Sequence, residues 1–208
     1  MDIQFYGANC VTLTYKGTRL VIDDNLAELG AKSIVKADDI VLYTGPHSVP
    51  ATAPRLLIDQ PGEYEVSDIS IEGVAAQANM DEGNQKNATI YKVTAGDLHV
   101  LITGHIYPEI TSRELEELGV VDVLVIPVGG NGYTLDAIGA LKVLKEIEPK
   151  FVIPTHYEEK GLNYPVPQQS LEQALKELAM EPKETTSKLR LKASELSDVT
   201  QLVVLERA

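Results

Sequence analysis

Four histidines are the side chains with the clearest capacity for chemistry in this sequence, because imidazole titrates near neutral pH and binds transition metals. They are His47, His99, His105 and His156. His47 follows the apolar run 40–44, which predicts a buried strand, and lies among two prolines and a glycine that favour neither strand nor helix. Such a stiff loop would hold the imidazole at the rim of a rigid scaffold. His99 falls in a predicted hairpin, where we expect it to face solvent.

A glycine-rich segment connects the apolar run 123–128 to a predicted helix at 134–148. Its residues are Gly129, Gly130, Asn131 and Gly132. Backbone amides in such a loop, together with the N-terminus of the following helix, could hold a small anion such as phosphate or carboxylate. The spacing of the glycines matches neither a Walker loop nor a dinucleotide-binding fingerprint. A tight turn from strand to helix is the alternative interpretation.

The composition indicates one globular domain with an acidic surface. Of the 208 residues, 44% are hydrophobic and 24% are charged, which is typical of one well-packed domain over residues 1–208. The 31 acidic residues exceed the 18 basic ones, and the net charge of −13 would repel nucleic acids and anionic membranes, so we expect neither as a partner. The lone Cys10 excludes an internal disulfide, and residues 1–10 lack the features of a signal peptide, which together predict a cytoplasmic location.

The order of the predicted elements indicates how these residues are positioned. The first half reads as short strands at 3–6, 11–15, 18–23, 40–44, 56–58, 64–66, 69–75, 89–93 and 98–103, with a short helix near 26–29 and a loop at 79–87. The second half alternates helices at 111–119, 134–148 and 168–180 with strands at 123–128, 151–154, 186–192 and 201–205. Thr111 and Glu114 have the spacing of a capping box at the start of the first of these helices. Strands first and βα units second predict two sheets with helices outside, which is a four-layer αββα sandwich of the α/β class.

Five segments of the chain, taken in order, resemble those of the metallo-β-lactamase superfamily. They are GANC at 7–10, LVID at 20–23, QPGEYE at 60–65, VLVIPVGG followed by YTLD at 123–136, and PK through PTHY at 149–157. The last three are most similar to a compact branch that includes metal-dependent hydrolases of the ascorbate-phosphate lactonase type. The resemblance implies the αββα sandwich of that superfamily. It does not by itself imply an activity, because function depends on the site rather than on the fold.

The segment 40–53 resembles the part of the superfamily that carries its signature, Thr-His-x-His-x-Asp-His. Thr44 and His47 match this signature. Gly45, Val49 and Pro50 stand where the signature has His, Asp and His. Members with the full signature hold two metal ions, which lower the pKa of a bound water and activate it for hydrolysis. The signature of this chain is therefore degraded, and most of the metal ligands that the resemblance implies are missing.

The same resemblance assigns positions to two further histidines. His156 stands at the last metal ligand, and His105 stands where the bridging aspartate is expected. With His47 they are the three candidate metal ligands. An imidazole cannot bridge two metal ions as a carboxylate does, so two alternatives remain open. The three histidines could form a rearranged site for a single Zn²⁺ or Mn²⁺ ion, or they could simply pack near the former cleft.

Three functions are compatible with these observations. The first is a ligand-binding descendant without catalysis or a metal cofactor, which would hold a small anionic molecule at the segment 129–132 beside Tyr157. The second is a metal-dependent hydrolase of esters, lactones or phosphoesters that uses His47, His105 and His156. The third is a structural scaffold that forms a homo-oligomer. We expect the first, so that the chain would not act as a standard dinuclear metallo-hydrolase.

Overall fold

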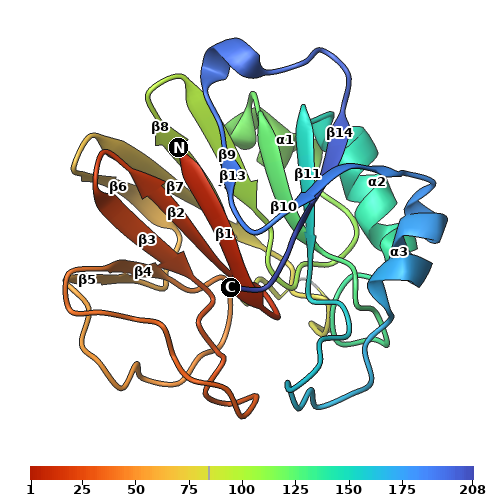
Figure 1. The fold of residues 1–208 in the computed structure, drawn as a ribbon, viewed down its shortest axis with the longest axis horizontal. Coiled ribbons are helices and arrows are strands. Elements are labelled where there is room, and N and C mark those ends of the chain that lie inside the picture. Colours follow the sequence, from red (N-terminus) through yellow and green to blue (C-terminus); the bar gives the residue numbers. More distant parts are fainter. Residues whose placement is uncertain (84) are drawn as a thin grey trace.

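Two β-sheets form the framework of the computed structural model, which describes residues 1–83 and 85–208 (Figure 1). One sheet consists of β1 (Asp2–Gly7), β2 (Cys10–Tyr15), β3 (Thr18–Ile22), β4 (Ile40–Leu42), β5 (Leu56–Ile58) and β13 (Leu189–Arg190), in the order β13-β1-β2-β3-β4-β5. The other consists of β6 (Gly62–Val66), β7 (Ile69–Ala76), β8 (Ala88–Ala95), β9 (Leu98–Ile102), β10 (Val123–Pro127), β11 (Phe151–Thr155), β12 (Pro182–Thr186) and β14 (Gln201–Leu205). Its order is β12-β14-β11-β10-β9-β8-β7-β6.

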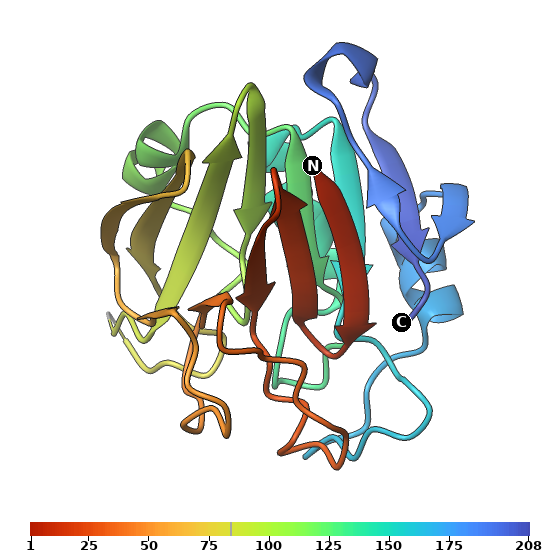
Figure 2. The same ribbon diagram turned by 60° about the vertical axis from the view of Figure 1, so that its left-hand side comes forward.

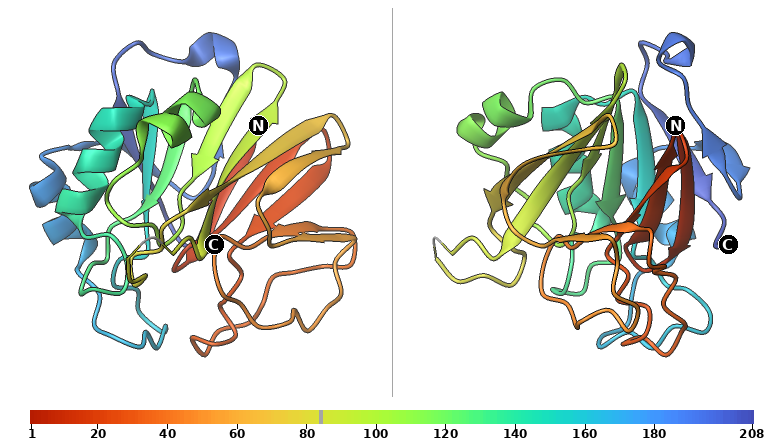
Figure 3. Two further views of the ribbon diagram at one scale, coloured as in Figure 1. Left: turned by 180° about the vertical axis from the view of Figure 1, so that it is seen from behind. Right: turned by 90° about the vertical axis from the view of Figure 1, so that its left-hand side faces the viewer.

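The two sheets pack against each other through a shared apolar core (Figure 2). Alternate residues of the first sheet, such as Ile3, Phe5 and Leu13, are fully buried in this core, as period-two strands require. The helices α1 (Ser112–Leu118), α2 (Ala137–Ile147) and α3 (Leu171–Leu178) lie on the outer side of the eight-stranded sheet (Figure 3). A short 3₁₀ helix, η1 (Ala193–Glu195), precedes β14. The mixed α/β architecture with two stacked sheets confirms the predicted fold class.

The outer face of the six-stranded sheet is covered by a loop. Val21 and Tyr43 of that face are buried under Leu26 and Leu29. The short helix predicted near 26–29 is wrong, because this segment forms turns and the chain reverses at Gly30 with a φ of 84°. A single turn closes too few hydrogen bonds to stabilise a helix, so the two leucines are held by burial instead.

Side-chain caps determine where the three α-helices begin. Thr111 and Glu114 form the expected capping box at α1. Helix α2 begins at Ala137 rather than at 134, because the Asp136 side chain accepts from the Gly139 amide. Helix α3 likewise begins after Ser170. Among the described residues, no helix has the length and apolar character needed to cross a bilayer.

Two polar segments differ from the prediction. The strand predicted at 186–192 is reduced to β13, whereas β12 was not predicted because its sequence, PKETT, is polar and exposed without apolar alternation. This strand exists through its pairing with β14 at the sheet edge. The loop predicted at 79–87 contains residue 84, which lies outside the described residues. In the rest of that loop, the Asp81 carboxylate accepts from the backbone and side-chain amides of Asn87.

The direction of the strands determines where a site can form. Strands β9, β10 and β11 are parallel, as are β3, β4 and β5. The carboxyl ends of parallel strands lie at one edge of a sheet, and the loops that follow them gather there. His105 follows β9, His156 follows β11, and Asp23 follows β3. The topology therefore brings the loops with most chemistry-bearing residues to one end of the sandwich.

Candidate functional site

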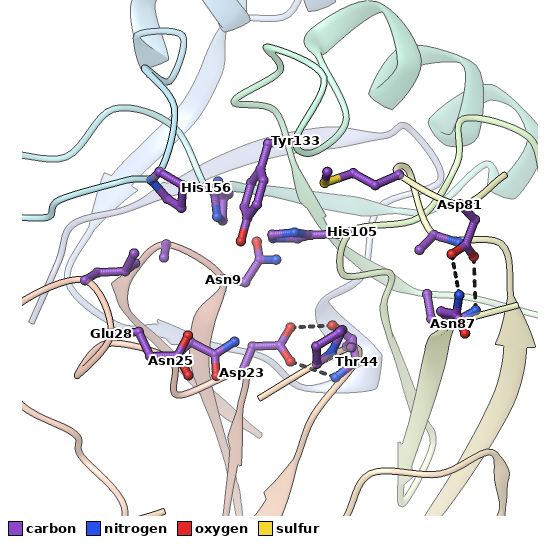
Figure 4. Close-up of a pocket in the computed structure, with 18 of the residues that line it drawn as sticks. Asn9, Asp23, Asn25, Glu28, Thr44, Asp81, Asn87, His105, Tyr133 and His156 are labelled. Carbon is purple, nitrogen blue, oxygen red and sulfur yellow. Dashed lines mark hydrogen bonds between the residues drawn. The ribbon is translucent and has the colours of Figure 1, made fainter. Parts of the chain in front are cut away.

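A cavity of about 670 Å³ opens at this end of the sandwich (Figure 4). Its polar lining comes from loops of both sheets, and includes Asn9, Asp23, Thr44, His105, Tyr133 and His156. Asn9 belongs to the turn between β1 and β2, and Tyr133 belongs to the loop between β10 and α2. Loops of both sheets therefore form the cavity, and its size suits a small organic molecule.

Two of the three candidate histidines meet in this cavity. The rings of His105 and His156 pack edge to face, with centroids 4.6 Å apart and planes at 89°. Tyr133 adds a third ring, whose centroid lies 5.0 Å from that of His105. The backbone fixes the position of His156, since this residue has a φ of 55° and its amide donates to the Ala8 carbonyl at 2.8 Å.

A hydrogen bond determines which nitrogen of His156 faces the cavity as a lone pair. The Gln168 amide nitrogen donates to the Val166 carbonyl at 2.8 Å, so the Gln168 oxygen faces the imidazole. His156 Nδ1 lies 3.0 Å from that oxygen and donates to it. In the neutral ring, Nε2 therefore carries the unshared pair. A buried imidazole held in this way can accept a hydrogen bond or bind a metal through Nε2.

Burial keeps both imidazoles neutral at pH 7. Loss of solvent lowers the pKa of His156 to about 4, against the smaller opposing effect of its bond to Gln168. The pKa of His105 falls to about 3, first through burial and then through repulsion from His156. Neither ring nitrogen of His105 has a hydrogen-bond partner within the described part of the chain. Neutral His105 is thus available as a donor and an acceptor, and neutral His156 as an acceptor through Nε2.

Asn9 presents an unpartnered donor to the cavity. Its side chain is 6% exposed, and its Oδ1 accepts from the Thr155 hydroxyl at 3.0 Å. Its Nδ2 has no hydrogen-bond partner among the described residues. An unpaired buried amide costs about 1–3 kcal/mol, so a ligand atom that accepts from Nδ2 would recover this energy. In Figure 4, Asn9 lies between the two histidines and the Asp23–Thr44 pair.

Asp23 joins the ends of β3 and β4. Its carboxylate accepts from the Thr44 amide and from the Thr44 hydroxyl, both at 2.7 Å. Burial raises the pKa of Asp23 to about 6, although the two bonds from Thr44 oppose this shift. The Asp23 backbone has a φ of 52°, which places the carboxylate over the next strand. The Asp23 carboxylate therefore connects the end of β3 to the end of β4.

His47 does not join the other two histidines. Its ring stacks on Tyr43, with centroids 3.8 Å apart, and its Nε2 lies 3.3 Å from the Asp59 carboxylate. Its Nδ1 lies 2.9 Å from the Ser48 carbonyl, so both ring nitrogens have oxygen partners. Together with Asp59 it lines a smaller neighbouring hollow of about 330 Å³.

The donors in the cavity do not fit the metal centre that the resemblance implies. Among residues 1–83 and 85–208, no three His, Cys, Asp or Glu side chains are grouped closely enough to hold a metal ion. Protein zinc sites use at least three such ligands, and His105 and His156 supply two. His99, expected to face solvent, is instead partly buried, with its Nδ1 2.9 Å from the Asp122 carboxylate. It does not line this cavity.

The glycine-rich segment 129–132 is occupied by internal hydrogen bonds. The Gly130 amide donates to the Leu135 carbonyl, and the Asp136 carboxylate occupies the N-terminus of α2 where an anion would bind. These glycines are not among the residues that line the cavity. A Cβ at Gly129 would collide with the His156 carbonyl and the Gln168 side chain. The absence of a side chain at Gly129 therefore allows Gln168 to reach His156.

Tyr157, expected to line the cavity, lies in the core. Its ring packs 5.7 Å from that of Phe5, and its hydroxyl donates to the Leu205 carbonyl. The chain bends after β11, where His156 has a φ of 55°, and the side chains of His156 and Tyr157 lie in different surroundings. The cavity tyrosine is Tyr133, which sequence reasoning did not single out.

Asn9 and Gln168 were also missed as site residues. Asn9 lies in the GANC segment that supported the family resemblance, and a polar residue between two predicted strands could have been read as a turn residue directed at a site. No sequence signal marks Gln168, because its role depends on the fold of the loop before α3.

Replacement of Gly129 by alanine should disturb His156 in the cavity, although Gly129 itself does not line the cavity. We expect Gly129→Ala to lower the free energy of unfolding by about 2 kcal/mol, because the new methyl group would displace Gln168 from His156. Urea denaturation measures this change, and ¹⁵N NMR of the imidazoles would report a loss of the fixed His156 tautomer. Gly45→Ala is the control, since a Cβ there meets nothing within 4 Å. Equal effects of both substitutions would contradict this role of Gly129.

The raised pKa of Asp23 predicts how the free energy of unfolding changes with pH. Because its folded pKa of about 6 exceeds the usual value of about 3.9, its contribution to stability is present below pH 4 and is lost as the pH rises through 6. Asp23→Asn removes this loss, so the variant should gain stability relative to the wild type between pH 4.5 and 7.5. Urea unfolding at several pH values measures the difference. The exposed substitution Asp198→Asn is the control, and a difference that is constant with pH would refute the assignment.

Comparison with known proteins agrees with this architecture. The family described as the β-lactamase superfamily domain matches residues 2–156. A protein of Carboxydothermus hydrogenoformans named UPF0173 metal-dependent hydrolase is 49% identical over 43 residues, which make up 21% of this chain and 19% of that protein. The chain therefore spans only a small part of this curated relative.

Two solved structures share the fold over nearly their whole length. A protein of Thermotoga maritima described as a Zn-dependent hydrolase of the metallo-β-lactamase superfamily is 24% identical, with a TM-score of 0.76 and coverage of 99% of this chain and 98% of that one. A protein of Parabacteroides distasonis described as a metal-dependent hydrolase is 18% identical, with a TM-score of 0.66 and coverage of 98% and 93%. At these identities the likeness shows the fold alone. Since the family match extends over residues 2–156, from β1 to the histidine that ends β11, the chain belongs to the β-lactamase superfamily.

Proposed function

We propose that this chain is a ligand-binding member of the β-lactamase superfamily, in which the cavity takes a small organic molecule in place of a metal centre. The observation that carries this proposal is the unpartnered Asn9 Nδ2, a buried donor on a residue that lines a cavity of molecular size. Buried donors are almost always satisfied in folded proteins, and an exception that lines a cavity is explained by a ligand.

The cavity offers a matched set of contacts to such a ligand. Asn9 Nδ2 would donate to a carbonyl or hydroxyl oxygen, and His156 Nε2 would accept from an N–H or O–H group. His105 supplies one further donor and one further acceptor, and Tyr133 supplies a ring against which apolar atoms can pack. A ligand with both polar and apolar parts would use all four residues.

The signature loop supports a role without a bound metal. Gly45 and Pro50 cannot ligate a metal through their side chains, and neither can Val49, which is 90% exposed. For His47 to reach the other histidines, it would have to leave its stacked position on Tyr43 and its contact with Asp59. Each change is unfavourable, so the remaining ligands are better suited to hydrogen bonding than to a metal ion.

Metal-dependent hydrolysis is the second candidate function. Relatives of this chain carry names that describe metal-dependent hydrolases. The state of His156 also favours it, because an Nδ1–H that donates to an amide oxygen, with Nε2 directed at a cavity, is the usual arrangement of a metal-binding histidine. A single Zn²⁺ or Mn²⁺ ion on His105 and His156 would need a third protein ligand, for which His47 is the candidate by sequence.

Removal of the Asn9 donor tests the proposed binding. We expect small polar molecules that bind the cavity to raise the unfolding temperature of the wild type, because a ligand at a hundredfold excess over its Kd stabilises the folded state by about 2.7 kcal/mol. Asn9→Leu should abolish most of this rise for the same molecules. Differential scanning fluorimetry with a fragment library measures both.

Thr155→Val provides the matched control for Asn9→Leu. It removes the same Thr155–Asn9 hydrogen bond but keeps Asn9 Nδ2, so ligand-dependent stabilisation should fall less than in Asn9→Leu. Stabilisation of wild type and Asn9→Leu by the same molecules to the same extent would contradict the proposal.

A further inference from the structure

Three carboxylates line the cavity, and no lysine or arginine of the described residues does so. They belong to Asp23 and Glu28, both in the loop between β3 and β4 of the first sheet, and to Asp81, in the loop between β7 and β8 of the second, on the opposite side of the cavity (Figure 4). The cavity therefore differs from an anion site, which would present cationic side chains or free backbone amides.

The charges of these three carboxylates are not balanced by ion pairs. Asp23 accepts only from Thr44, Glu28 accepts from the Ser48 amide, and Asp81 accepts from amides of Ala78 and Asn87. All of these donors are uncharged. In the part of the chain that the structure describes, the ion pairs engage other carboxylates, so the negative charge at the cavity is free to act on a ligand.

The unpartnered Asn9 Nδ2 indicates a second property of the occupant. Its side chain is 6% exposed and lines the same cavity, so it requires an oxygen or nitrogen acceptor on the ligand. A bare cation cannot satisfy an N–H donor. The lining also lacks the grouped ligands that a metal ion needs, and a volume of about 670 Å³ is much larger than an ion.

We propose that the cavity selects a small organic cation, namely an amine that also carries a carbonyl, amide or hydroxyl oxygen. The ammonium group lies on the side of the cavity that carries Glu28 and Asp23, and the oxygen accepts from Asn9 Nδ2. This inference rests on the proposed ligand-binding function and gives its ligand class. It replaces the small anion expected from the sequence, because the segment 129–132 does not line the cavity, its Gly130 amide donates to Leu135, and Asp136 caps the N-terminus of α2.

Sets of three matched compounds test the charge of the ligand. Each set shares one scaffold and one amide oxygen and differs in a single group, as in 3-(aminomethyl)benzamide, 3-(hydroxymethyl)benzamide and 3-carboxybenzamide. Ligand-observed NMR on the full chain at pH 7.5 gives the affinities. In each set whose compounds bind, we expect the amine to bind about 2- to 5-fold tighter than the alcohol and the carboxylate to bind weakest. This preference for the amine should become smaller at high salt.

Glu28→Gln separates charge from shape in the same experiment. Glutamine keeps an oxygen that can accept from the Ser48 amide, so the loop should be retained while one charge is lost. The amines should lose about 2- to 5-fold in affinity and the alcohols should not change. Glu177→Gln on α3, which removes a carboxylate that does not line the cavity, should change neither.

The outcomes distinguish the two proposals. Equal binding of all three charge classes, or tighter binding of the carboxylates, would overturn the cationic ligand but leave a ligand-binding protein. Failure of every compound to bind, or binding that Asn9→Leu leaves unchanged, would overturn both proposals.

Discussion

Two hydrogen bonds between the β1–β2 turn and the end of β11 hold the cavity together. The His156 amide donates to the Ala8 carbonyl at 2.8 Å, and the Thr155 hydroxyl donates to Asn9 Oδ1 at 3.0 Å. These bonds join residues nearly 150 positions apart and connect the two sheets at their open end. They also fix Asn9 against His156, so the donor and the acceptor that face the cavity keep their relative positions. Burial at this junction then keeps the imidazoles neutral and raises the pKa of Asp23.

Much of the fold could be predicted because its elements are consistent in pattern and local chemistry. The fully buried runs of β10 and β11 read directly as strands, and the Thr111–Glu114 capping box correctly located α1. Errors arose where tertiary contacts override local pattern. The loop 26–30 has helical apolar spacing but is held by packing on the first sheet, and the polar β12 is a strand only because β14 pairs with it.

The site was predicted less well, for a physical reason. The family resemblance singled out His105, His156 and His47 together, but only the structure shows that the rings of the first two meet whereas His47 stacks on Tyr43. The segment 129–132 has the composition of an anion loop, yet its Gly130 amide donates to Leu135 and the Asp136 carboxylate caps α2. Hydrogen-bond occupancy and side-chain direction depend on distant partners such as Gln168, and these are not encoded in local spacing.

The metal content of the purified chain tests the central claim most directly, namely that the cavity is not a metal centre. Untagged full-length protein would be dialysed against traces of Zn²⁺ and Mn²⁺, then against metal-free buffer, and analysed by inductively coupled plasma mass spectrometry. The variants His105→Ala, His156→Ala and His47→Ala would be treated in parallel. The account predicts far less than one metal ion per chain in all four proteins. Near-stoichiometric metal in the wild type that is lost in the His105 and His156 variants would contradict it and would favour the hydrolase.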